Sequence, residues 1–263
     1  MDKNTASVSA RFRQYGEPPS QVAVVHGGPG GAGEVQPLAR ELGAQGYRVL
    51  EPFQTENTIA GQVAELAAQI NQSCQRPVCL VGWSWGAWLV CLLAAEHPEL
   101  VSRLLLVGSA PFDARHAEAV AQTRLSRLSE ERQAEFARVS ANLDDPGNVR
   151  RLAELTDAAD TYLARGASPA EINFDREIHA AVRAEAKALR SSGRLLERLT
   201  HVRCPVTAFH GDHDPHPAIG VKEPLASVLP RSDFILLHRC GHKPWNETHA
   251  HYVFFAALES AMR

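Results

Sequence analysis

The stretch Gly82-Trp83-Ser84-Trp85-Gly86 places a serine between two glycines, directly after one apolar run and directly before another. We interpret it as a strand, a sharp turn and a helix. Such a turn holds the serine in a strained conformation with its hydroxyl exposed, and it needs glycine two residues to either side because a Cβ would clash there. The pattern alone is weak, but its strand-to-helix context predicts a nucleophilic serine at position 84. The alternative is a serine that only caps the following helix.

A serine hydroxyl is a poor nucleophile at neutral pH, so it needs a base within hydrogen-bond reach and a third group that orients the base. Two polar loops, 210–215 and 239–245, each follow a predicted strand near the C-terminal end. The first contains Asp212 and Asp214, and the second contains His242. Because ligands of an open α/β sheet bind at the carboxyl ends of its strands, these groups are candidates for the acid and the base. The three groups follow one another in the order serine, acid, histidine.

Short apolar strands alternate with amphipathic helices around these loops. The predicted strands are 22–25, 47–53, 78–81, 103–108, 206–209 and 234–237, with one edge strand within 6–16. The predicted helices include 35–46, 59–70, 222–229 and 247–262, besides the one that follows Ser84. Alternation with short connections is typical of a parallel sheet covered on both faces. We therefore predict an α/β fold with a doubly wound, mostly parallel sheet.

The sequence changes character between 112 and 200, where no buried strand is predicted and Ala, Arg, Glu and Leu dominate. Helix starts are predicted at 129–131, 145–146 and 168–171. We predict a core formed by 1–111 and 201–263, with 112–200 inserted as an all-helical cap. An apolar stripe that includes Leu125, Leu128 and Val139 is expected to cover the site and limit water. The alternative is an ordinary helical subdomain packed on the sheet.

Composition excludes several classes of function. The chain has 263 residues and a formal net charge of −3, which gives no electrostatic basis for binding nucleic acid or an anionic membrane. Residues 1–10 lack the apolar core of a signal peptide, and the longest apolar run, 88–95, is too short to span a bilayer. A cytoplasmic protein with small-molecule partners is expected. The five cysteines are scattered, which argues against a disulfide framework and a structural zinc site.

Four blocks of the sequence together resemble the α/β-hydrolase fold family: 26–31, 82–86, 211–214 and 241–247. The resemblance spans the chain outside the insertion. It implies His242 as the base, from the pattern Gly-His-x-Pro-x-x-Glu, and Asp214 as the acid, three residues after the glycine that ends the penultimate strand. Asp212 is the less favoured acid. In some members the acid follows the strand after the elbow helix, and Asp113 occupies that place here.

Acyl transfer to a serine also needs two backbone N–H groups that face the oxygen on which negative charge develops. The N–H of Trp85, at the start of the helix, is one predicted donor, and the resemblance implies Gly28 in the glycine-rich loop as the second. Trp83 is a candidate for the wall of a substrate pocket, with a core position as the alternative. His26 is expected to be structural.

Within the family, the motif His-Gly-Gly-Pro-Gly-Gly paired with Gly-x-Ser-Trp-Gly is most similar to the proline iminopeptidase group. That group carries carboxylates in its cap that hold the substrate ammonium. The acidic residues of this insertion stand mostly beside arginines, where solvated ion pairs are expected instead. The resemblance thus implies a serine hydrolase of a small ester, amide or short peptide, without cofactor or metal, and proline iminopeptidase activity is the alternative.

Three other functions fit parts of the sequence. The glycines of 28–33 satisfy Gly-x-Gly-x-x-Gly, with Glu51 near the end of the next strand, as in dinucleotide-binding oxidoreductases. Pro29, however, removes an N–H where a pyrophosphate needs donors. Five His and Asp residues within 210–216 suggest a metal site, but they lie in one loop without typical zinc spacing. A non-enzymatic small-molecule receptor on the same fold is the third alternative.

Overall fold

A computed structural model describes residues 7–8, 11–166 and 172–263. At its centre lies an eight-stranded sheet with the strand order β1-β2-β5-β3-β6-β7-β9-β10. Six strands pair in parallel: β3 (Ser20–Val25), β5 (Val49–Pro52), β6 (Cys74–Trp83), β7 (Val101–Val107), β9 (Val206–Gly211) and β10 (Ser232–Leu237). The doubly wound, mostly parallel α/β fold predicted from the sequence is confirmed.

The N-terminal segment forms two strands where the sequence predicted one. β1 (Ser7–Val8) pairs antiparallel with β2 (Phe12–Tyr15), which in turn pairs antiparallel with β5. The prediction of a single edge strand within 6–16 was therefore wrong. A weak alternation of apolar residues does not reveal this reversal, because both arms of a hairpin have the same period of two residues.

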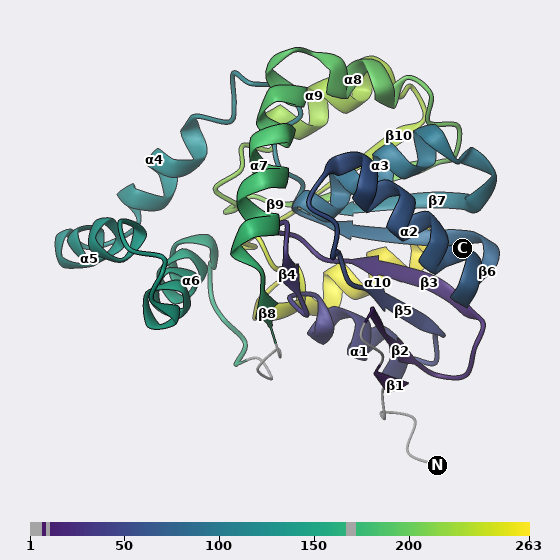
Figure 1. Ribbon diagram of the computed structural model, residues 1–263, viewed down its shortest axis with the longest axis horizontal. Coiled ribbons are helices and arrows are strands. Elements are labelled where there is room, and N and C mark those ends of the chain that lie inside the picture. The colour runs from purple at the N-terminus through teal and green to yellow at the C-terminus, as the bar shows by residue number, and fades with distance from the viewer. Residues whose placement is uncertain (1–6, 9–10, 167–171) are drawn as a thin grey trace.

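Helices cover both faces of the sheet (Figure 1). α1 (Gln36–Ala44) and α10 (His251–Met262) contribute to one apolar cluster. The second cluster takes in α2 (Ile59–Ser73), α3 (Trp85–Glu96) and α9 (Ile219–Val228). Ten consecutive residues of α3, Trp85–Ala94, are buried, so the helix behind the serine is a rigid part of the core. No helix in the described part of the chain is long and apolar enough to cross a membrane.

The helices between β7 and β9 fall into two groups. α4 (Ala119–Ser126), α5 (Glu130–Ser140) and α6 (Pro146–Asp160) form an arm beside the sheet, whereas α7 (Arg176–Ser191) and α8 (Arg194–Leu199) pack against α2, α3 and α9, the helices that cover one face of the sheet (Figure 1). Leu128 and Val139 are buried in the arm but belong to neither apolar cluster of the sheet, and Leu125 is 37% exposed. The predicted apolar stripe thus contributes mainly to packing within the arm.

Two of the three predicted helix starts in this region are confirmed, because the side chains of Ser129 and Asp145 cap α5 and α6. The third, at 168–171, lies outside the described residues. The prediction of an all-helical insertion was wrong at β8 (Asn173–Phe174), which pairs antiparallel with β4 (Gly31–Ala32) in the glycine-rich loop. A strand of two residues is too short to produce a detectable hydrophobic period.

Candidate active site

Ser84 lies at the turn between β6 and α3, at the carboxyl end of one of the interior strands of the sheet. Its φ of 54° and ψ of −115° are strained for a residue with a side chain. The turn requires glycine on both sides, because a Cβ at Gly82 would clash with the carbonyl of Gly86, and one at Gly86 with the carbonyl of Val25. The Ser84 side chain makes no capping hydrogen bond to α3. This geometry disfavours the interpretation of Ser84 as a helix cap.

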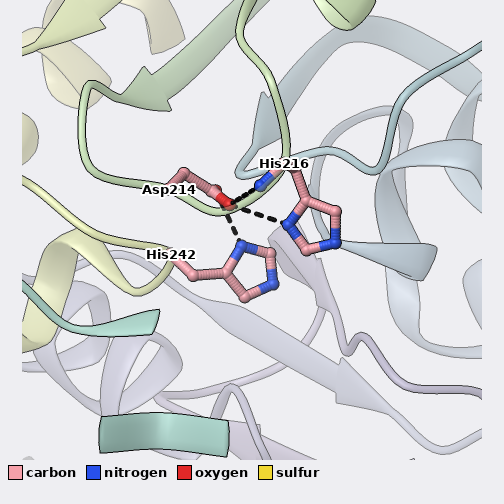
Figure 2. A group of neighbouring side chains, drawn as sticks. All are labelled: Asp214, His216 and His242. Carbon is pink, nitrogen blue, oxygen red and sulfur yellow. Dashed lines mark hydrogen bonds and ion pairs between the residues drawn. The ribbon is translucent and has the colours of Figure 1, made fainter. Parts of the chain in front are cut away.

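Asp214 and His242 face each other on the loops that follow β9 and β10 (Figure 2). His242 Nδ1 lies 2.7 Å from Asp214 Oδ2, and the two side chains are 6% and 0% exposed. Burial opposes the charged form of Asp214, but its interactions with the imidazoles of His242, His216 and His210, which include a hydrogen bond from His216, outweigh burial and hold the pKa of this carboxyl well below its usual range. Asp214 is therefore ionised, as required of a group that orients and stabilises an imidazolium.

The other two candidate acids contact different groups. Asp212 Oδ2 lies 3.2 Å from His238 Nδ1, and Asp212 Oδ1 accepts a hydrogen bond from the Cys240 N–H at 3.2 Å. Asp113 Oδ1 lies 2.8 Å from His116 Nδ1. Among the three carboxylates considered from the sequence, only Asp214 contacts His242 in the described structure.

His216, which sequence analysis considered only as part of a possible metal site, joins this pair (Figure 2). Its Nδ1 lies 2.7 Å from Asp214 Oδ1, and its backbone N–H donates to the same oxygen at 2.9 Å. The His216 and His242 rings lie 4.6 Å apart between centroids. Behind them, His210 Nε2 lies 2.7 Å from the His216 carbonyl oxygen. The spacing Asp-x-His is a signal for such a local turn, since an aspartate accepts hydrogen bonds from backbone two residues on.

Asp214, His216 and His242 offer three possible metal-ligand atoms within 4.8 Å of one another. Each histidine nitrogen, however, lies 2.7 Å from a different oxygen of the carboxylate, which is hydrogen-bond spacing. Neighbouring ligand atoms of a tetrahedral zinc lie roughly 3.3 Å apart, given Zn–N bonds of about 2.0–2.1 Å. The geometry thus fits a hydrogen-bonded network better than a metal centre.

Trp83 and Gly108 determine where the His242 side chain lies. The Trp83 indole N–H donates to the His242 carbonyl oxygen at 2.9 Å, and the two rings lie 4.9 Å apart. Trp83 is 4% exposed, so the residue considered for a substrate pocket lies buried against the histidine. Gly108 has a φ of 52°, and a Cβ there would lie 2.8 Å from the His242 carbonyl oxygen and 3.0 Å from its Nδ1. Only glycine leaves room for the ring at this point.

The loop that carries His242 is tied to the segment after α6. The Glu247 carboxylate accepts hydrogen bonds from the N–H groups of Gly241, Tyr162 and Leu163, each at 2.8 Å. The His242 N–H donates to the Asp160 carbonyl oxygen at 2.9 Å. The final helix was predicted from 247 but begins only at His251. Glu247 instead lies before the helix, where its carboxylate holds the loop of His242 in place.

The glycine-rich loop passes directly beside the serine. A Cβ on Gly27 would lie 2.9 Å from Ser84 Cβ and 2.6 Å from the Trp83 ring. The predicted N–H donors, on Gly28 and Trp85, make no hydrogen bond to another described residue. Neither backbone group is therefore committed to another part of the described structure.

His26 and Glu51 have structural contacts. His26 is fully buried, its Nε2 accepts from the Gln54 N–H at 3.2 Å, and burial lowers its pKa to about 4. Glu51, the acid of the dinucleotide alternative, is also fully buried, where it accepts from the Tyr15 hydroxyl at 3.1 Å and pairs with Arg13 at 3.3 Å. Glu51 is thus already engaged in the core, which argues against binding of a ribose.

Glu34 places a carboxylate beside the same loop. Although the residue as a whole is partly exposed, its Oε2 is buried and has no hydrogen-bond partner among the described residues. Burial raises the pKa of Glu34 to about 7, against the attraction of Lys243. An ionised carboxylate in this position costs folding free energy.

We expect Glu34→Gln to stabilise the protein at pH 8 by about 2 kcal/mol. The folded pKa of about 7 lies above the ordinary value of 4.5, so the Glu34 penalty is absent at low pH, grows as pH rises through this window and is complete above it. At pH 5 the gain should fall below about 1 kcal/mol. Chemical denaturation of both proteins at the two pH values measures this, and an equal gain at both would show that the charge is not the cause.

Comparison with known proteins shows similarity to a protein family and to a curated relative. A family model described as alpha/beta hydrolase fold matches residues 22–244. The pimeloyl-[acyl-carrier protein] methyl ester esterase of Aromatoleum aromaticum is 29% identical over 167 residues, which cover 62% of this chain and 66% of that protein. The chain thus spans slightly less than two thirds of the length of this curated relative.

Two solved structures cover almost the whole chain. VinJ superimposes with a TM-score of 0.66 and 18% identity, covering 98% of this chain and 97% of its own. The proline iminopeptidase of Mycobacterium smegmatis superimposes with a TM-score of 0.62 and 19% identity, with the same coverage of 98% and 97%. At these identities the similarity shows a shared fold.

Proposed function

Because the chain belongs to the α/β hydrolase fold family, we propose that it is a serine hydrolase of small esters, with Ser84 as nucleophile, His242 as base and Asp214 as acid. The observation that carries the proposal is the buried 2.7 Å contact between His242 Nδ1 and Asp214 Oδ2. Both residues follow parallel strands of the sheet that also presents the strained Ser84, at its carboxyl edge. This combination supplies a nucleophile, a base and a group that orients the base.

In the proposed reaction, His242 Nε2 takes the proton of Ser84 Oγ while this oxygen attacks the ester carbonyl carbon, and Asp214 stabilises the imidazolium. The N–H groups of Gly28 and Trp85 donate to the oxyanion of the tetrahedral intermediate. His242 then protonates the departing alkoxide, and the acyl group remains bound to Ser84 Oγ as an acyl-enzyme. A water molecule, deprotonated by the same imidazole, then attacks the acyl carbon; the bond to Ser84 Oγ breaks, the imidazolium returns a proton to this oxygen, and the carboxylic acid is released.

The ion pairs of the arm favour esters over peptides with an N-terminal proline. Glu135 and Glu154 both bind Arg151, at 2.7 and 2.8 Å, and Asp160 binds Arg124 through two hydrogen bonds of 2.6 and 2.7 Å. These carboxylates are already neutralised by arginine. The curated relative named as a methyl ester esterase supports the same choice. Iminopeptidase activity stays the second candidate, because Glu34 is an unpaired carboxylate beside the proposed oxyanion loop.

We expect kcat/KM for a short p-nitrophenyl ester to exceed that for proline p-nitroanilide by at least about 100-fold. The ester has the better leaving group, so a triad can turn it over without specific binding of an ammonium. Both rates should be measured on one preparation, with the Ser84→Ala protein as the control for background hydrolysis. A preference for the prolyl amide would instead establish the iminopeptidase alternative, and turnover of neither substrate by the folded protein would favour the receptor.

A further inference from the structure

His216 contacts one oxygen of the proposed acid, Asp214 Oδ1, while the proposed base contacts the other, Oδ2, and the two imidazole rings lie side by side (Figure 2). We propose that His216 is a positioning residue for the Asp214–His242 pair, which fixes the Asp214 carboxylate and takes up part of its negative charge. This inference rests on the proposed function, in which Asp214 and His242 are the acid and the base.

The contacts of Asp214 Oδ1 fix the orientation of the carboxylate. Two donors of His216, the ring Nδ1 at 2.7 Å and the backbone N–H at 2.9 Å, bind this one oxygen. Rotation about the Cβ–Cγ bond of Asp214 would break both contacts together. The side chains of Asp214 and His216 are 0% and 9% exposed, so water is poorly placed to replace a lost donor. Oδ2 is thereby held toward His242.

The protonation states in this cluster follow from its acceptors. The ionised Asp214 has no proton to give, so the hydrogen between it and His216 belongs to Nδ1 of His216. Burial lowers the pKa of His216 to about 4, and the ring is therefore neutral. His210 must donate from Nε2, because the His216 carbonyl oxygen only accepts, and this leaves His210 Nδ1 as the buried atom without a partner. His216 thus acts as a neutral donor.

The other titratable groups near the cluster lie on several elements, and a substitution at position 216 replaces none of them. They are His210 on β9, Arg124 and Arg127 from the arm, Cys240 and Lys243 on the loop of His242, and Glu34 beside the glycine-rich loop. Arg124 is bound to Asp160, and Lys243 Nζ lies 2.7 Å from Asp157. Burial raises the pKa of the Cys240 thiol, which stays neutral.

A carboxylate that accepts hydrogen bonds from two imidazole rings stabilises a positive charge on one ring less than a carboxylate that accepts from that ring only. Removal of the His216 donor should concentrate the charge of Asp214 on His242 and raise the pKa of His242. The base is then protonated at a higher pH, so the acidic limb of the kcat/KM profile moves upward. A looser carboxylate should also lower kcat.

The test compares variants at 216 with and without a donor. In His216→Asn an amide N–H replaces the ring N–H, whereas His216→Leu and the smaller His216→Ala remove it. We expect the donor-free changes to move the acidic limb of the kcat/KM profile upward by about 0.5–1 pH unit and to lower kcat about tenfold, the scale of one hydrogen bond to a charged group. His216→Asn should keep the limb in place. Equal effects of all three, or an unmoved limb in the donor-free proteins, would overturn the inference.

A second measurement does not depend on activity. NMR titration of labelled histidine in the Ser84→Ala background reports the pKa of His242, which should rise when His216→Leu is added and stay constant when His216→Asn is added. If the single Ser84→Ala change leaves ester hydrolysis intact, the proposed function fails while this titration still tests His216. If Ser84→Ala abolishes hydrolysis but the addition of His216→Leu leaves the NMR titration of His242 unchanged, only the present inference fails.

Discussion

Ser84→Ala is expected to lower kcat for ester hydrolysis by about 10³- to 10⁶-fold, the range seen when the nucleophile of a serine triad is removed. Alanine retains the backbone and the proposed oxyanion donors, so substrate binding should change little while the attacking oxygen is lost. The matched control is Ser109→Ala, because Ser109 is buried close to the same strand ends and its hydroxyl donates to the Ala110 carbonyl. We expect this control to retain kcat within about tenfold.

The activities of Ser84→Ala and Ser109→Ala together show whether Ser84 is the nucleophile. Ser84→Ala activity above about a tenth of the original would contradict the assignment of Ser84, whether or not the control stays active. Unfolding temperatures of both proteins, measured alongside, should remain close to that of the parent, because Ser84 makes no side-chain capping bond to α3.

Asp214→Asn is expected to lower kcat by about 10⁴-fold, as the corresponding change does in a serine protease triad. An asparagine amide favours the wrong tautomer of His242 and removes the charge that stabilises the imidazolium. Asp212→Asn and Asp113→Asn are the controls, since these residues contact His238 and His116 rather than His242. Both should stay within about tenfold of the parent. A larger loss from Asp113→Asn than from Asp214→Asn would place the acid after β7.

The elements next to Ser84 could be predicted from the sequence because their signals are local. An apolar run, the pattern Gly-x-Ser-x-Gly and a second apolar run describe a strand, a turn and a helix within some 20 residues, and β6 and α3 have these positions. The parallel sheet followed from the alternation of strands and helices. The choice of Asp214 over Asp212 needed the resemblance, since both stand in the same polar loop.

The surroundings of His242 could not be predicted, because they depend on contacts between residues far apart in the chain. Trp83 and His242 are 159 positions apart, and Glu247 accepts from Tyr162 across 85. Neither contact leaves a pattern in the sequence near either residue. From the sequence, Trp83 was instead predicted as a possible pocket wall and Glu247 as the start of a helix. The contact of His216 with Asp214 was missed for a related reason, because the polar loop 210–216 has the same sequence whether or not its last histidine binds the carboxylate.

The site of covalent labelling by a fluorophosphonate tests the central claim most directly, because such a probe is attacked by an activated serine and remains bound to it. The probe is added to the native protein, and the modified peptide is identified by mass spectrometry. The proposed triad predicts one label, on Ser84, which disappears in Ser84→Ala and forms much more slowly in Asp214→Asn. A label on another serine, or no label on the folded protein, would contradict it.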